Sequence, residues 1–153
     1  PPDFMAREIT DDRWVPTFRE NLKTNRNQLL LLYDEDIPVC CATFGPARID
    51  AGLQAGTVCK FNSRGYEGWG EIISFYTHPD HKRKGYGTKL MEEVLRRLSG
   101  QGYLQVFLFV LRENENARRF YEKMGFAWDG THEDIPFPPD TICVDLRYTR
   151  SLP

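Results

Sequence analysis

Hydrophobic and polar positions follow their clearest pattern in the second half of the chain. Apolar residues recur there with the period of a helix in some segments and of a strand in others. The pattern predicts strands at 71–77, 103–111 and 142–148, and helices at 85–98 and 114–124. The run at 103–111 is apolar almost throughout, which is typical of a strand covered on both faces. This order of elements predicts an α/β fold with a mixed sheet and a central parallel pair of strands.

The first half of the chain has weaker patterns. Residues 11–23 predict a short amphipathic helix with an acidic first turn. Apolar runs at 28–33 and 37–44, separated by three acidic residues, predict a β-hairpin. The glycine-rich stretch from 45 to 70 predicts a long irregular connection with one short strand at 57–61.

Length and composition exclude several classes of function. The 153 residues are expected to form one domain, 1–153. The net charge of −2 does not favour nucleic acid or an anionic membrane as a partner. The longest apolar run, 29–33, is too short for a membrane span, and the start resembles no cleavable signal. Four cysteines without C-x-x-C spacing favour free thiols in a cytoplasmic protein over a disulfide or zinc framework. No metal site is expected, since His78 and His81 lack a third ligand at a useful spacing.

The segment 82–87, KRKGYG, stands between a predicted strand and a predicted helix. Its two glycines allow a tight turn, and a helix start offers unpaired N–H groups and the positive end of the helix dipole. Three consecutive cations add positive charge, so the segment predicts a phosphate or pyrophosphate site. A plain helix-capping loop with a basic surface remains an alternative. The P-loop signature and the third glycine of the dinucleotide fingerprint are both missing from this segment, which argues against a nucleotide hydrolase or a Rossmann enzyme.

Residues 71–91, EIISFYTHPDHKRKGYGTKLM, and 114–126, NENARRFYEKMGF, together resemble the GNAT superfamily of acetyl-CoA-dependent N-acetyltransferases. The segment 82–87 is similar to the family's phosphate loop, Gln/Arg-x-x-Gly-x-Gly/Ala. The second segment is similar to the family pattern N-x-x-A-x-x-x-Y-x-x-x-G-F. The strong resemblance covers 71–126, a little over a third of the chain. Lys82 stands where the family usually has Gln or Arg, so the backbone contacts of the loop are the firmer part of the resemblance.

The resemblance implies a site for acetyl-CoA as cosubstrate. In this family two parallel strands splay apart, and the pantetheine arm of the cofactor pairs with their exposed backbone; here these would be 71–77 and 103–111. The amides of 83–88 would hold the pyrophosphate. The cofactor-binding residues implied are Phe75, Tyr76, Thr77, Lys82, Arg83, Lys84, Gly85, Tyr86, Gly87, Thr88, Asn114, Ala117 and Tyr121. Asn114 also suits a helix N-cap, and the two roles are compatible.

The resemblance further implies direct transfer of an acetyl group to a primary amine within a ternary complex. An alkylammonium group has a pKa of about 10.4 and must lose a proton before it attacks. Glu71 is similar in position to the catalytic glutamate of the histone-type members and would act as a water-mediated base. Other members place the base on the second strand, where this chain has Phe109. Tyr121 is similar to the tyrosine that faces the cofactor sulfur and would stabilise the leaving thiolate. A polar strand end for Glu71 and a core aromatic for Tyr121 remain alternative roles.

The acceptor and the partners are less defined. The acidic segment 129–140 corresponds to a connection that lines the acceptor side in the family, so it favours a cationic small-molecule or peptide amine. The family opens with a strand and a helix before the helix at 11–23, and both are expected to be missing here. The sheet edge left exposed makes a homodimer a candidate. A non-catalytic acyl-CoA-binding domain of the same fold and a nucleic-acid-binding module are the alternative functions.

Overall fold

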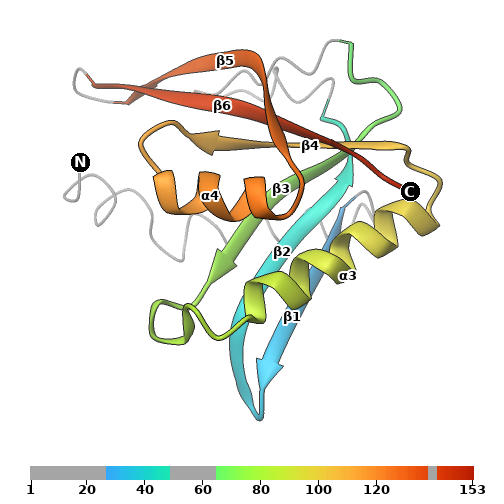
Figure 1. Ribbon diagram of the computed structural model, residues 1–153, viewed down its shortest axis with the longest axis vertical. Coiled ribbons are helices and arrows are strands. Elements are labelled where there is room, and N and C mark those ends of the chain that lie inside the picture. Colours follow the sequence, from blue (N-terminus) through green and yellow to red (C-terminus); the bar gives the residue numbers. More distant parts are fainter. Residues whose placement is uncertain (1–26, 49–64, 138–140) are drawn as a thin grey trace.

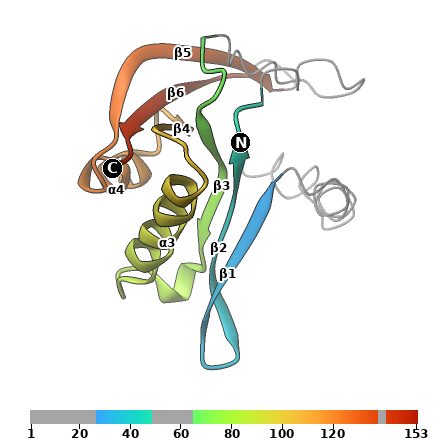
Figure 2. The same ribbon diagram turned by 90° about the vertical axis from the view of Figure 1, so that its right-hand side faces the viewer.

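One sheet with two helices on one of its faces forms the described part of the molecule (Figures 1 and 2). The computed structural model describes residues 27–48, 65–137 and 141–153. Its elements are β1 (Gln28–Asp34), β2 (Ile37–Pro46), β3 (Gly70–Thr77), the 3-10 helix η2 (Pro79–His81), α3 (Tyr86–Gly100), β4 (Gln105–Leu111), α4 (Glu115–Lys123), β5 (Ala127–Phe137) and β6 (Thr141–Ser151). The strands lie in the order β1-β2-β3-β4-β6-β5. None of the described helices combines the length and the hydrophobicity that a membrane span requires.

Most of the predicted elements are confirmed, including the hairpin and the mixed sheet with its central parallel pair. The predicted helix at 11–23 and the predicted strand at 57–61 lie outside the described residues. The prediction that 129–140 is only a connection is wrong, because Ala127–Phe137 form β5, which pairs antiparallel with β6. Two features hide this strand in the sequence. It is an edge strand, where charged residues and Pro136 are tolerated, and its register shifts between Trp128 and His132.

The parallel contact between β3 and β4 is short. These strands pair only from Gly70 with Val106 to Ile72 with Leu108, and then they diverge (Figure 1). Their outer neighbours hold them over a much longer stretch, since β2 pairs with β3 and β6 pairs with β4 along most of their lengths. The sheet therefore opens in its middle while both sides of the opening stay supported.

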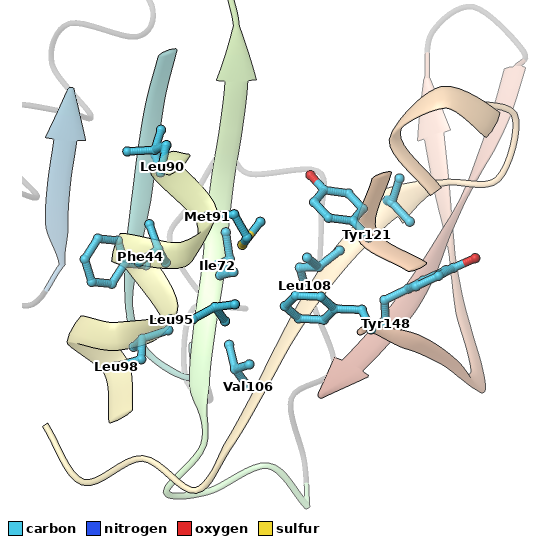
Figure 3. Close-up of a cluster of buried hydrophobic side chains, with 14 of the residues drawn as sticks. Phe44, Ile72, Leu90, Met91, Leu95, Leu98, Val106, Leu108, Tyr121 and Tyr148 are labelled. Atoms are coloured by element: carbon cyan, nitrogen blue, oxygen red, sulfur yellow. The ribbon is translucent and has the colours of Figure 1, made fainter. Parts of the chain in front are cut away.

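The hydrophobic core lies between α3, α4 and the sheet (Figure 3). The helix predicted at 85–98 is confirmed as α3, and its apolar side chains are buried at helical spacing. These side chains are Leu90, Met91, Val94, Leu95 and Leu98. The sheet contributes Phe44, Ile72 and Leu108 to the same cluster. This packing fixes α3 against the strands and with it the turn that precedes the helix.

Met91 tests the packing of this core. Its side chain is fully buried within the cluster, so replacement by alanine leaves a cavity and is expected to lower the free energy of unfolding by about 2–5 kcal/mol. Leu104→Ala is the control, because Leu104 is 71% exposed; the expected change there is below about 0.5 kcal/mol. Urea denaturation measures the change in the free energy of unfolding for both variants, and an unchanged m-value shows that the two free energies are comparable. Equal effects of the two substitutions would contradict the described packing.

Candidate active site

The opening between β3 and β4 exposes backbone within the sheet. Beyond Ile72, the described residues show no ladder pairing between the two strands. Backbone N–H and C=O groups that lose a ladder partner must find another one, such as water or a ligand. Phe75, Tyr76 and Thr77, for which the family resemblance implies contacts to the pantetheine arm, lie on the diverging end of β3. The arrangement offers an extended ligand a strand edge to pair with.

Aromatic side chains surround this opening. Phe75 stacks on Phe120 of α4, with 5.6 Å between ring centroids. The neighbouring Tyr121 is only 8% exposed, whereas Tyr76 is 59% exposed. Burial raises the pKa of Tyr121 to about 12, and the nearby Tyr76 adds to the rise. Tyr121 therefore keeps its proton at physiological pH and can donate a hydrogen bond.

The turn before α3 has the shape that the sequence predicts for an anion site. Gly85 stands at the N-cap with φ of 80° and provides no side-chain hydrogen bond to the helix. The amides of Tyr86, Gly87 and Thr88 belong to the first turn, where backbone donors have no partner within the helix. The preceding cations Lys82, Arg83 and Lys84 are all exposed. This turn, residues 82–88, is called the phosphate loop below.

The phosphate loop lies against the open end of β3. A Cβ atom on Gly87 would come 3.5 Å from Oγ1 of Thr77 and 3.6 Å from the ring of Phe120. The Cys40 thiol donates to the same Thr77 oxygen at 3.3 Å and ties β2 to this corner. The predicted sites for the pantetheine arm and for the pyrophosphate are therefore adjacent in space.

A groove of about 670 Å³ continues from the phosphate loop along α3. It lies between α3, the end of α4 and the end of β6, and three cationic side chains contribute to its walls. The lining residues are Thr88, Glu92, Leu95, Arg96, Ser99, Lys123, Met124, Gly125, Arg150 and Pro153. The Arg150 guanidinium donates to the carbonyl oxygen of Met124 and so closes the C-terminal end of α4.

Asn114 links the end of β4 to α4. Its side-chain oxygen accepts a hydrogen bond from the Ala117 amide at 3.2 Å, so the N-cap role is confirmed. Ala117 itself packs against the core cluster. A contact of these two residues with a cofactor stays a prediction.

Glu71 lies in a buried ion pair just before the strands diverge. Its side chain is 1% exposed, and Arg48 donates hydrogen bonds to both carboxylate oxygens. The Arg48 amide donates to Oε2 at 2.9 Å, while Nε and Nη2 donate to Oε1 at 3.0 and 2.6 Å. Glu71 is a candidate from the sequence alone, whereas Arg48 is not, because Arg48 lies in a segment without periodic pattern. A base role for Glu71 would require water to reach an oxygen that Arg48 holds.

A second ion pair, which is partly buried, lies on the face of the sheet opposite to α3 and α4. Arg147, which is 8% exposed, donates to Asp129 Oδ2 at 2.8 Å. The Arg147 guanidinium stands 3.8 Å above the ring of Tyr66, and the Tyr66 hydroxyl donates to Asp129. Burial opposes ionisation of Asp129, but hydrogen bonds from Tyr66, Thr131 and Arg147 outweigh it and lower its pKa. Asp129 was expected to help attract a cationic acceptor, and this role stays a prediction; the same carboxylate also pairs with Arg147.

The Glu71 and Arg48 pair can be tested by a double-mutant cycle. Glu71→Leu and Arg48→Met are each expected to lower the free energy of unfolding by about 3–5 kcal/mol, because each removes one half of an ion pair whose carboxylate is fully buried. The double variant is expected to lose less than the sum of the two. Chemical denaturation of the four proteins measures these energies. Strict additivity would contradict a direct interaction.

Known proteins share both the sequence pattern and the fold. Residues 3–126 match the sequence model of the acetyltransferase (GNAT) family. An uncharacterized N-acetyltransferase of Mycobacterium bovis is 38% identical over 61 residues, which are 40% of this chain. The matched region spans only 39% of that curated relative.

Two solved structures resemble the fold over nearly the whole chain. A ribosomal-protein-alanine N-acetyltransferase from Brucella melitensis has a TM-score of 0.71 at 18% identity, over 94% of this chain and 80% of its own. A Bacillus subtilis acetyltransferase in complex with CoA has a TM-score of 0.65 at 14% identity, and the match covers 98% of this chain and 89% of the Bacillus subtilis chain. The expected GNAT-like fold is therefore confirmed. Because the family model extends over most of the sequence and includes the phosphate loop, β3, β4 and α4, the chain belongs to the acetyltransferase (GNAT) family.

Proposed function

We propose that the protein transfers an acetyl group from acetyl-CoA to the primary amine of a small molecule or peptide by direct attack in a ternary complex. The observation that carries this proposal is the position of the phosphate loop beside the opening between β3 and β4. One ligand with an extended amide-containing arm and a pyrophosphate matches both features at once. The CoA complex of the similar Bacillus subtilis protein supports the choice of ligand.

The cofactor would lie across three adjacent elements. The backbone of Phe75, Tyr76 and Thr77 would pair with the pantetheine arm, as an added strand pairs with a sheet edge. The amides of 83–88 would bind the pyrophosphate at the positive end of α3, assisted by the cations at 82–84. The groove that starts at Thr88 would take the adenosine part, and Lys123 in its wall suits a phosphate.

The transfer requires one bond to form and one to break. The acceptor loses a proton and its nitrogen attacks the thioester carbonyl carbon, after which the carbon–sulfur bond breaks and CoA leaves as a thiolate. Backbone N–H groups of the diverging β3 would stabilise the charge on the thioester oxygen. Glu71 would receive the amine proton through a water molecule that replaces one hydrogen bond from Arg48.

Tyr121 would stabilise the departing sulfur. Its pKa of about 12 exceeds that of an ordinary thiol, about 8.5, so complete proton transfer to the thiolate would cost roughly 5 kcal/mol. A hydrogen bond from the neutral phenol to the sulfur avoids this cost. The buried position of Tyr121 strengthens such a bond because water is excluded from it.

The environment of Glu71 favours one alternative function. Because Arg48 occupies both of its oxygens, the same fold would also suit a domain that binds an acyl-CoA without turnover. Detection of acetylated product by mass spectrometry, with a panel of primary amines and peptides, separates the two functions. Binding of acetyl-CoA without any product would favour the non-catalytic domain.

The proposal also includes a cytoplasmic location and a homodimer. The described cysteines, Cys40, Cys41 and Cys143, are free thiols, which fits a cytoplasmic protein. A homodimer would form through an edge of the sheet. At the β1 edge, Leu31 and Tyr33 are about half exposed, at 48% and 52%.

Titration with acetyl-CoA tests the cofactor site. Isothermal calorimetry is expected to show binding to the unsubstituted protein and weaker binding of dephospho-CoA. The combined substitution Lys82→Ala/Arg83→Ala/Lys84→Ala is expected to raise the Kd for acetyl-CoA by about tenfold or more, because charge-assisted contacts to phosphate are lost. The melting temperature of this variant serves as its control, since the three side chains are exposed. An unchanged Kd would contradict the assignment of the loop.

Tyr121→Phe tests the stabilisation of the leaving group. The substitution keeps the ring contacts with Phe120 and Phe126 and removes only the hydroxyl. We expect kcat to fall by about 10- to 100-fold, the effect of one hydrogen bond to a charged atom, while the Kd for acetyl-CoA stays nearly constant. Steady-state thiol release and calorimetry measure the two quantities. A normal kcat would show that the phenol has only a packing role.

A further inference from the structure

The side chain of Tyr86 connects the phosphate loop to the β1–β2 hairpin. Tyr86 is the first residue of α3, and its hydroxyl donates to Oδ2 of Asp34, the last residue of β1. The hydrogen bond raises the pKa of Tyr86, so the phenol keeps the proton that it donates. The Tyr86 ring also packs against the core cluster and lies 6.3 Å from the ring of His81.

This hydrogen bond gives the start of α3 a side-chain anchor that its N-cap does not provide. Most helices are held at this position by an N-cap side chain that bonds to the first-turn amides. Here the N-cap is Gly85, which makes no such bond and has a φ of 80°. Arg83 also adopts a positive φ, 64°. The backbone between them therefore depends on contacts made by its neighbours, and Tyr86 is the adjoining residue with a side-chain hydrogen bond to another element.

The hydrogen bond to Asp34 supports the start of α3, but the negative charge of Asp34 disfavours an anionic ligand there. Its carboxylate lies one tyrosine side chain away from the amides of the phosphate loop, so it repels a bound phosphate through space. The hydrogen bond and the charge can be separated by substitution. An asparagine keeps an oxygen acceptor for the Tyr86 hydroxyl and removes the charge, whereas an alanine removes both.

We propose that Asp34 is a positioning residue for cofactor binding, which acts through Tyr86 to orient the first-turn amides of α3 toward the pyrophosphate. This inference rests on the proposed function, because it takes acetyl-CoA as the ligand. Asp34 itself does not touch the cofactor. A purely structural hydrogen bond between hairpin and helix would instead support stability and leave affinity unchanged.

Four variants test this role: Tyr86→Phe, Asp34→Ala, Asp34→Asn and Tyr86→Phe/Asp34→Ala. Calorimetry with acetyl-CoA is expected to show a Kd about five- to tenfold higher for Tyr86→Phe, because the hydrogen bond to a charged group is lost. Asp34→Ala loses the same hydrogen bond and is expected to raise the Kd by a smaller factor, because it also removes the repelling charge. The double variant is expected to bind no more weakly than Tyr86→Phe, since the two residues act through one contact. Asp34→Asn is expected to bind as tightly as the unsubstituted protein or more tightly.

Tyr33→Phe is the matched control, because Tyr33 adjoins Asp34 and its side chain is 52% exposed; its Kd is expected to stay unchanged. Lower melting temperatures with an unchanged Kd in Tyr86→Phe and Asp34→Ala would overturn the inference. So would additive losses in the double variant, or an Asp34→Asn protein as weak as Asp34→Ala. Absence of acetyl-CoA binding by the unsubstituted protein would overturn the proposed function as well, whereas binding that the variants leave unaltered overturns the inference alone.

Discussion

The early end of the pairing between β3 and β4 is the constraint on which the candidate site depends. The two parallel strands share only the stretch from Gly70 to Ile72, while β2 and β6 support them from outside. Because each strand keeps its outer partner, the strands can separate without either losing its position. Backbone donors and acceptors then lie inside a sheet rather than at its margin. A ligand that is itself an extended chain of amides can satisfy them.

The two faces of the sheet contribute different parts of the candidate site. The helix face provides the apolar core, the phosphate loop and the groove along α3. The opposite face holds the ion pair of the fully buried Glu71 with Arg48 and the partly buried pair of Asp129 with Arg147. A pair with a buried charge contributes little net stability, but breaking it is costly. In the proposed reaction the cofactor occupies the helix face and the opening, and the proton of the acceptor leaves toward Glu71.

Local pattern and distant contact differ in how well a sequence predicts them. The helix α3 and the strand β4 were predicted because their apolar patterns are long and unbroken. The family resemblance placed Glu71 on β3 and Tyr121 on α4. The partner of Glu71 was not predictable, since Arg48 comes from an irregular segment 23 residues away. The partner of Asp129 was not predictable for the same reason, because Arg147 lies 18 residues further on. The strand β5 was missed because an edge strand with a register shift has no clean alternation.

Hydrogen–deuterium exchange with and without acetyl-CoA tests the opening between β3 and β4 most directly. If the cofactor pairs with the diverging strand, the amides at 74–77 and those of the phosphate loop gain protection together when acetyl-CoA binds. The amides of β1, on the far side of β2 from this opening, should change little. Binding with protection confined to other elements, and none at 74–77, would contradict the proposed site.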